Sequence, residues 1–546
     1  DDNAFMLHGL TIFISAFLLL LVQLIIGKRI LPWFGGAPSV WTTCMLFFQL
    51  LLLGGYVYAH LLGTRLSNRR QVQIHGGMLV ISGLLLSWLW WQWGNPILPG
   101  EHWKPATPDR PIWQILKLLT ASVGLPFFIL SATSPLLQRW YSLGGAREET
   151  YRLYALSNAG SMVALLGYPF LLEPVTGVAK QGHGWGVLYM MFIAACIGCA
   201  MKLPANGVGG REISGDEVPD IRPGCLRILL WMFLAACASA MLLAVTNSLC
   251  QEGAVVPFLW VLPLALYLLS FILCFDSSRW YRRRWFLLLG AIASIAVLIT
   301  AFRGVQLKIA WHVISYGMFL FFFCMTCHGE LVRLKPTTRY LTLFYLMVAL
   351  GGAVGGIFVG IVAPMFFKGY WEFHIVLMAG WILLALVLAF DMTSPFHRGD
   401  RLHFYLLLFV LGFVIAQFSQ LLFGLSLPLP VPGIVVSILL SAVVTGVFAI
   451  VTRNAAFVDS KYWPRILVGA IIFIAECFVL QRVRSNDSTS VRMDRNFYGV
   501  TTVMRRVTAE EPRLPILHLM HGQINHGAQI LDDNWRTRPI SYYSEE

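Results

Sequence analysis

The chain has 546 residues, of which 57% are hydrophobic and 14% aromatic, while only 12% are charged. Soluble globular proteins usually carry about 25% charged residues. A soluble fold cannot bury so much apolar surface, so the composition excludes a soluble enzyme, a disordered protein and a disulfide-rich secreted scaffold. It predicts an all-α polytopic membrane protein whose main partner is the lipid bilayer. The formal net charge of +13 fits orientation in the membrane, and we expect no nucleic-acid partner.

Apolar runs long enough to cross a bilayer recur along most of the chain. A spanning helix needs about 20 such residues. The sequence contains fifteen such runs. The last is the weakest candidate for a membrane span, because it is short and contains Glu476. The predicted spans are 6–27, 39–63, 72–93, 111–137, 151–172, 183–202, 224–248, 255–275, 284–302, 308–328, 340–366, 372–390, 402–423, 431–451 and 464–481.

Arginine and lysine gather in alternate loops, namely those that follow the even-numbered spans. Because cytoplasmic loops of membrane proteins are enriched in these residues, the pattern places the N-terminus and the even loops in the cytoplasm. The side of the C-terminal segment then depends on the number of spans. Fifteen spans put it outside, whereas fourteen put it inside, and the sequence leaves both open.

A Gly- and Pro-rich linker divides the first twelve spans into two sets of six. Tyr154 precedes Gly160 by six residues in span 5, and Tyr345 precedes Gly351 by six in span 11. Matches of this kind occur in the same order in the two sets of spans. They predict an internal duplication, with two parallel six-helix halves as in the major facilitator fold. The expected organisation is a first half at 1–202, a linker at 203–223, a second half at 224–390, extra spans at 391–484 and a β segment at 485–546.

The composition changes after the last span and becomes polar and rich in turn-forming residues. Residues 500–507 alternate as a strand would, and 514–522 form a second strand-like run. About 60 residues with so few apolar positions make a poor independent core. We therefore expect the start of a small β domain.

Short motifs in every part of the chain resemble one known family. They include Gly27-Lys28-Arg29, Ser134-Pro135-Leu136-Leu137-Gln138-Arg139, Tyr168-Pro169-Phe170-Leu171-Leu172-Glu173-Pro174, Cys327-His328-Gly329-Glu330-Leu331 and His526-Gly527-Ala528-Gln529. The chain is similar in these to the fused major-facilitator/spermidine-synthase-like membrane proteins of bacteria. The resemblance implies a bacterial cytoplasmic (inner) membrane location.

The same resemblance implies that a Rossmann-like domain, similar to aminopropyltransferases, follows the β segment. The sequence reaches Glu546 without that domain's Gly-rich nucleotide loop, so an enzyme would need residues beyond it. In the spermidine-synthase-like segment, the resemblance marks His521, His526, Gln529 and Tyr543. The positions that match Gln529 and Tyr543 help to line the amine and nucleotide sites in that family.

Polar side chains inside predicted spans are the main site candidates, because burying them in a bilayer is costly. Gln23, Gln49 and Asn158 are such residues, although hydrogen bonding between helices is the more common role of Gln and Asn. Few acidic groups lie deep in the spans, which counts against a carrier of cationic polyamines.

A charged cluster ends span 10, where His328, Glu330 and Arg333 follow one another within six residues. Glu330 and Arg333 are three residues apart and could form an ion pair within one helix. One interpretation is a cytoplasmic gate between the halves, with these residues and the polar ones above as substrate or gating candidates. The other is a charged helix end at the level of the lipid headgroups.

The segment Cys324-Met325-Thr326-Cys327-His328 matches the attachment pattern of c-type haem. Covalent haem attachment occurs outside the cytoplasm, whereas the charge pattern places this end of span 10 inside it. The motif also sits in a packed apolar helix, so we disfavour haem at Cys324, Cys327 and His328. We predict no cofactor, metal site or catalytic residue.

Three functions of different classes remain open. The first is a transporter-like carrier with a site between the halves and an unknown small-molecule substrate. The second is a non-transporting membrane subunit that scaffolds protein partners in a larger complex. The third is a membrane-bound aminopropyltransferase-like enzyme, which rests on the resemblance alone and requires a longer chain.

Overall fold

A computed structural model describes most of the chain, in two compact units. One unit comprises residues 1–370 with 494–500, and the other comprises 371–493 with 501–546. The described residues are 2–34, 38–105, 110–142, 150–203, 223–252, 258–303, 307–336, 340–390, 433–451, 490–496, 499–508, 513–521 and 524–535, with residues 405, 408, 412 and 474.

The first six predicted spans are all helical, and three-residue to five-residue segments of other helix type interrupt or connect them. Spans 4 and 5 are continuous helices that each contain a π-helical turn. The elements are α1 (Asp2–Ile30), η1 (Leu31–Phe34), α2 (Pro38–Arg65), α3 (Asn68–Trp93), η2 (Glu101–Trp103), α4 (Pro111–Leu119), η3 (Thr120–Gly124), α5 (Leu125–Ser142), α6 (Thr150–Gly167), η4 (Tyr168–Leu172), α7 (Glu173–Val175) and α8 (Val178–Met201).

The second set of helices repeats this plan. In the first unit it comprises α9 (Cys225–Glu252), α10 (Phe258–Asp276), α11 (Arg283–Arg303), α12 (Ile309–Arg333), α13 (Leu341–Ile357), η7 (Phe358–Val362) and α14 (Ala363–Phe366). The second unit contains α15 (Glu372–Phe390) and α18 (Gly433–Val451), which match predicted spans 12 and 14.

Nine helices of the described part are long and apolar enough to cross a membrane, and shorter apolar helical stretches add to them. The predicted all-α multi-pass membrane fold with a small C-terminal β segment is therefore confirmed. Spans 402–423 and 464–481 lie outside the described residues, apart from isolated positions. The predicted domain boundaries stay predictions.

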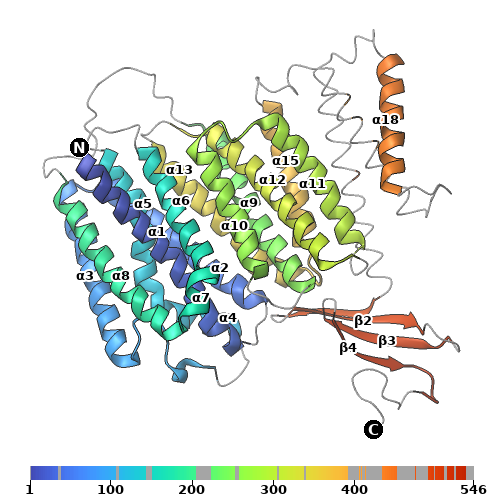
Figure 1. The fold of residues 1–546 in the computed structure, drawn as a ribbon, viewed down its shortest axis with the longest axis horizontal. Helices are drawn as coiled ribbons and strands as arrows, with labels where there is room; N and C mark the ends of the chain where they lie inside the picture. Colours follow the sequence, from blue (N-terminus) through green and yellow to red (C-terminus); the bar gives the residue numbers. More distant parts are fainter. Residues whose placement is uncertain are drawn as a thin grey trace. The chain divides into compact units, whose positions relative to one another are not determined.

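Helix packing within the first unit repeats with a period of six spans. In the first half α1 packs along α6 and α5, and α2 packs on α5. In the second half α9 packs along α13 and α12, and α10 packs on α12. The halves meet through two equivalent pairs, α2 with α13 and α6 with α10. Figure 1 shows these helices side by side as long rods. The chain's own contacts thus carry the internal duplication that the sequence predicts.

In each half, two helix backbones approach closely at one of the glycines that match in the duplication, Gly160 in span 5 and Gly351 in span 11. A Cβ atom on Gly160 would lie 2.5 Å from the carbonyl oxygen of Phe13 on α1. A Cβ on Gly351 would overlap the carbonyl oxygen of Met232 on α9, and one on Gly355 would lie 2.6 Å from that of Ala236. Only glycine permits these contacts, which is how small residues drive helix association in a bilayer.

Proline explains the three π-helical turns. Each five-residue turn precedes a proline by two positions, so the residue four before the proline is the middle of the turn: Ser122 before Pro126, Phe170 before Pro174 and Gly360 before Pro364. A proline ring clashes with the carbonyl group of the residue four positions earlier, and proline has no backbone N–H to donate to that carbonyl. Widening the helix to π spacing relieves the clash. Spans 5 and 11 share this device, which supports the duplication.

The C-terminal strands form an antiparallel sheet of order β1-β2-β3-β4, with bounds β1 (Ser490–Asn496), β2 (Gly499–Val507), β3 (Pro515–His521) and β4 (Ile524–Ile530). Thr501 lies opposite His521, and Ile516 lies opposite Ile530. A bulge interrupts the register between Leu519 and Met520. The predicted strands at 500–507 and 514–522 are confirmed as β2 and β3.

Adjacent glycines of α13 provide a matched test of this packing. Gly351→Ala places a methyl group against the Met232 carbonyl, whereas Gly352→Ala meets no atom within 4 Å. We expect Gly351→Ala to lower the free energy of unfolding by about 1–3 kcal/mol, as overpacking does, and Gly352→Ala to leave it unchanged. Thermal unfolding in detergent measures both. Equal melting temperatures would contradict the close approach of α9 and α13.

Candidate functional site

Side chains of α2 form hydrogen bonds to the second half near both ends of the helix. Near its start, Thr42 Oγ1 donates to Asn247 Oδ1 of α9 at 3.2 Å. Near its end, His60 Nδ1 lies 3.0 Å from the hydroxyl oxygen of Thr342 on α13. These bonds therefore tie the two halves at opposite ends of the same helix.

The middle of α2 is bonded to the second half through Gln49. Its Nε2 donates to Ser239 Oγ of α9 at 3.0 Å, and that hydroxyl donates to the carbonyl of Gly352 on α13 at 3.0 Å. A Cβ on Gly356 would overlap Gln49 Oε1, so this glycine makes room for the amide. Gln49 Oε1 is buried and has no hydrogen-bond partner among the described residues. We call the set Thr42, Gln49, His60, Ser239, Asn247 and Thr342 the inter-half seam.

The seam also fixes which helix ends share a face of the membrane. We call the face where α1 begins the N-terminal face and the face where it ends the distal face. Because α2 follows α1, Thr42 lies toward the distal face and His60 toward the N-terminal face. His60 bonds Thr342 at the start of α13, and a Cβ on Gly360 of η7 would contact Thr42 at 3.4 Å. Span 11 thus runs from the N-terminal face to the distal face.

The other two predicted amides lie on helices of the first half. Gln23 of α1 is buried, and its Nε2 donates to the carbonyl of Leu19, one turn earlier in the same helix, at 3.1 Å. Its bond is local, so this contact provides no link between helices. Asn158 lies on α6, the helix that contacts α10, and its Nδ2 is buried with no partner among the described residues. Gln49 and Asn158 therefore both carry an unused polar atom.

Glu330, the acidic member of the predicted cluster, is almost fully buried, with a side-chain exposure of 1%. Its Oε1 accepts from Arg283 Nε at 2.6 Å and from the Tyr281 hydroxyl at 2.8 Å. Arg283 Nη2 also pairs with Glu330 Oε2, so the contact is bidentate. Burial and the Glu330 carboxylate raise the pKa of Tyr281 well above its ordinary value. The Tyr281 hydroxyl therefore stays protonated and donates its hydrogen bond to Glu330.

The remaining members of the predicted cluster point elsewhere. Arg333 Nε lies 4.0 Å from Glu330, so the expected pair within the helix is the weaker contact. His328 Nδ1 lies 2.9 Å from Ser270 Oγ of α10, and its ring lies on Phe271 with centroids 3.7 Å apart. His328 Nε2 is buried without a partner among the described residues. These neighbours all belong to the second half, and a gating role stays a prediction.

Sequence reasoning missed Arg283 and Tyr281. The available signal was the run Arg282-Arg283-Arg284, which lies in the basic loop after span 8 and at the start of span 9. The cysteines of the haem-like motif, Cys324 and Cys327, are fully buried on α12. Within the described ranges, no group of three or more His, Cys, Asp or Glu side chains is placed to hold a metal ion.

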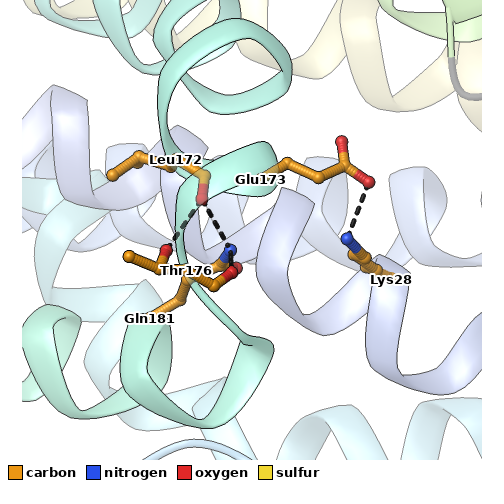
Figure 2. Close-up of polar contacts among 5 residues, drawn as sticks. All are labelled: Lys28, Leu172, Glu173, Thr176 and Gln181. Atoms are coloured by element: carbon orange, nitrogen blue, oxygen red, sulfur yellow. Dashed lines mark hydrogen bonds and ion pairs between the residues drawn. The ribbon is translucent and has the colours of Figure 1, made fainter.

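On the distal face, an ion pair joins the end of α1 to the end of span 5. Lys28 Nζ lies 2.7 Å from Glu173 Oε1. Next to it, the Leu172 carbonyl accepts from Thr176 Oγ1 at 2.7 Å and from Gln181 Nε2 at 3.3 Å, as Figure 2 shows. The same carbonyl also accepts from the backbone N–H of Thr176 at 3.0 Å, so the end of the π turn is held by one backbone and two side-chain donors.

The predicted residues of the β segment lie on the last two strands. His521 of β3 and His526 of β4 have ring centroids 5.6 Å apart. Gln529 of β4 pairs with Leu517 in the register and is exposed. Tyr543 lies outside the described residues.

Comparison with known proteins gives distant structural similarity only. No family model and no curated protein matches the chain. Solved structures with a similar helix arrangement include the proton:xylose symporter XylE bound to 6-bromo-6-deoxy-D-glucose, of the major facilitator superfamily (TM-score 0.46, 12% identity, 71% of this chain and 96% of that chain). The nucleoside transporter NupG gives a TM-score of 0.42 at 12% identity, with 70% of this chain and 100% of that chain covered.

A bacterial homologue of the human lysosomal transporter Spinster covers more of the chain, 88% of it and 97% of its own length, at a TM-score of 0.40 and 13% identity. These likenesses are too distant to carry an inference about substrate. Support for a function comes instead from the contacts within this chain.

Removing the charge of Glu330 tests the buried pair. Glu330→Gln leaves the Arg283 guanidinium buried, with a side-chain exposure of 9%, so we expect a loss of about 3–5 kcal/mol in unfolding free energy. Arg333→Gln should cost less than about 1 kcal/mol, because its contact is long and half-exposed. Replacing both partners with leucine should recover stability relative to Glu330→Gln. A chemical or thermal melt that ranks the variants otherwise would contradict this assignment.

Proposed function

We propose that the protein is a carrier that moves a small polar solute across a bacterial cytoplasmic membrane by alternating access, with its N-terminus in the cytoplasm. We also propose that it belongs to the fused major-facilitator/spermidine-synthase-like proteins. One observation carries the proposal of transport: two halves of equivalent internal packing meet through equivalent helix pairs and a seam of uncharged hydrogen bonds.

The two kinds of contact differ in how readily they separate. Within each half, helix backbones touch at Gly160 or Gly351, and no side chain can enter between them. Between the halves, the described bonds join hydroxyls, amides and one imidazole. Such bonds between membrane helices average about 0.6 kcal/mol each in measured cases. The halves can therefore move as rigid bodies while the seam bonds break and form at one end or the other.

Two unused polar atoms suggest where a solute binds. Gln49 Oε1 accepts hydrogen bonds, Asn158 Nδ2 donates them, and both atoms are buried. They lie on α2 and α6, the first-half helices that contact the second half. Burying such atoms without a partner is costly, which favours sites that a ligand completes. Since no carboxylate takes part in the seam bonds, we expect a neutral polar solute recognised by hydrogen bonds, rather than a polyamine.

Spin-label distances test whether the halves move. One pair, Met201→Cys with Leu226→Cys in a Cys225→Ser background, reports on the N-terminal face. The other pair, Val175→Cys with Met365→Cys, reports on the distal face. All four positions are exposed, and each pair joins the two halves. We expect two distance populations for each pair in proteoliposomes. Cross-linking Thr42→Cys to Asn247→Cys should leave only the shorter distance between the two distal labels. The two labels at the N-terminal face should then show only the longer distance.

A label pair within one half is the matched control. Trp91→Cys with Val175→Cys lies in the first half, and both positions are exposed. Its distance should not change when the cross-link forms. A single unaltered distance for both inter-half pairs, with and without the cross-link, would contradict alternating access.

A further inference from the structure

Arg495, in the part of β1 that belongs to the first unit, contacts the chain just after span 11. Arg495 of β1 donates from Nη1 to the carbonyl of Gly369 at 2.6 Å. Its guanidinium carbon also lies 4.5 Å from the centre of the Tyr370 ring. A charged hydrogen bond and a cation–π contact thus act on the same side chain. Residues 494–500 belong to the first unit together with residues 1–370, so both contacts lie within one unit.

The position of Gly369 identifies the face on which Arg495 lies. Span 11 ends with α14 at Phe366, and Gly369 follows three residues later. Span 11 runs toward the distal face, because Thr342 at its start meets His60 and Gly360 near its end meets Thr42. Gly369, Tyr370 and Arg495 therefore lie on the face opposite the N-terminus.

We propose that Arg495 holds residues 494–500 at the distal face, so that the β segment that continues from them works outside the cytoplasm. The outward direction rests on the orientation in the proposed function, whereas the choice of the face opposite the N-terminus does not. A chain that leaves the distal face after Phe366 and is back there at Arg495 crosses the membrane an even number of times. The four spans predicted from the sequence at 372–390, 402–423, 431–451 and 464–481 agree with an even number, so the contact favours the fifteen-span alternative.

One charge pattern favours the opposite side. Arg482 and Arg484 follow the last predicted span, and the positive-inside rule alone would keep them in the cytoplasm. The rule expresses a statistical preference, whereas a residue cannot bond a carbonyl across a bilayer. The Arg495 contact is therefore the stronger indicator.

The placement changes what the β segment can bind. An adenosyl-methionine-type donor is made in the cytoplasm, so a sheet on the outer face does not meet it. Any ligand or partner of the exposed Gln529 and His526 edge comes from the outer compartment instead.

Thiol labelling of the full chain in spheroplasts tests the placement, with a membrane-impermeant maleimide as the probe. Val507 of β2 is 59% exposed, so Val507→Cys presents a thiol on the sheet. Native Cys225 is exposed at the start of α9 on the N-terminal face and serves as the internal control. We expect the thiol introduced on β2 to react in intact spheroplasts and Cys225 only after permeabilisation. Reaction of both thiols only after permeabilisation, or the reverse pattern, would overturn the outward placement.

The anchor itself is tested by limited proteolysis of the C-terminal segment in the same spheroplasts. Arg495→Ala removes both contacts, and Arg495→Lys keeps the charge but loses the planar guanidinium. We expect Arg495→Ala to speed cleavage about tenfold, the effect of losing one charge-assisted hydrogen bond, and Arg495→Lys to lie between. Arg505→Ala, at an exposed position of β2, should match the wild type. Equal cleavage of Arg495→Ala and Arg505→Ala would overturn the anchoring role.

Discussion

The contact on which the helical unit depends is the close approach of two helix backbones at glycine in each half. In lipid, helices gain no hydrophobic advantage by meeting, so close van der Waals packing must hold them together. Gly160 against Phe13 and Gly351 against Met232 provide that packing at equivalent places. The prolines that end spans 5 and 11, with their π turns, then give both helices the same shape beyond the contact.

In the proposed carrier, the inter-half seam is the place where movement of the two halves costs least. Uncharged bonds at Thr42, Gln49 and His60 link α2 to the second half along its length. The charged contacts have a different role, because Glu330 with Arg283 and Lys28 with Glu173 each join elements within one half. A buried ion pair, Glu330 with Arg283, and a partly exposed one, Lys28 with Glu173, thus lie within the halves, whereas the seam bonds between the halves are uncharged.

Composition and periodicity were sufficient to predict the spans that the structure describes and the duplication, because burial of apolar surface in lipid dominates these features. Alternation of residue types was sufficient for strands β2 and β3. The sequence also marked Gln49 as a costly polar residue inside a span and Glu330 as part of a charged cluster at a helix end. It could not identify their partners, since Ser239 and Arg283 lie far away in the chain and meet them only after the helices pack. In the expected cluster at the end of span 10, His328 is directed to α10, while Glu330 pairs mainly with Arg283 and only at 4.0 Å with Arg333.

The most direct test of the central claim is efflux from proteoliposomes loaded with a bacterial small-metabolite extract, followed by mass spectrometry. The variant Thr42→Cys with Asn247→Cys, joined by a reducible cross-linker, fixes the seam at the distal face. The account predicts that at least one polar compound leaves wild-type vesicles faster than protein-free ones. That efflux should stop with the cross-link and return on reduction. Equal release of every compound from wild-type, cross-linked and protein-free vesicles would contradict a carrier.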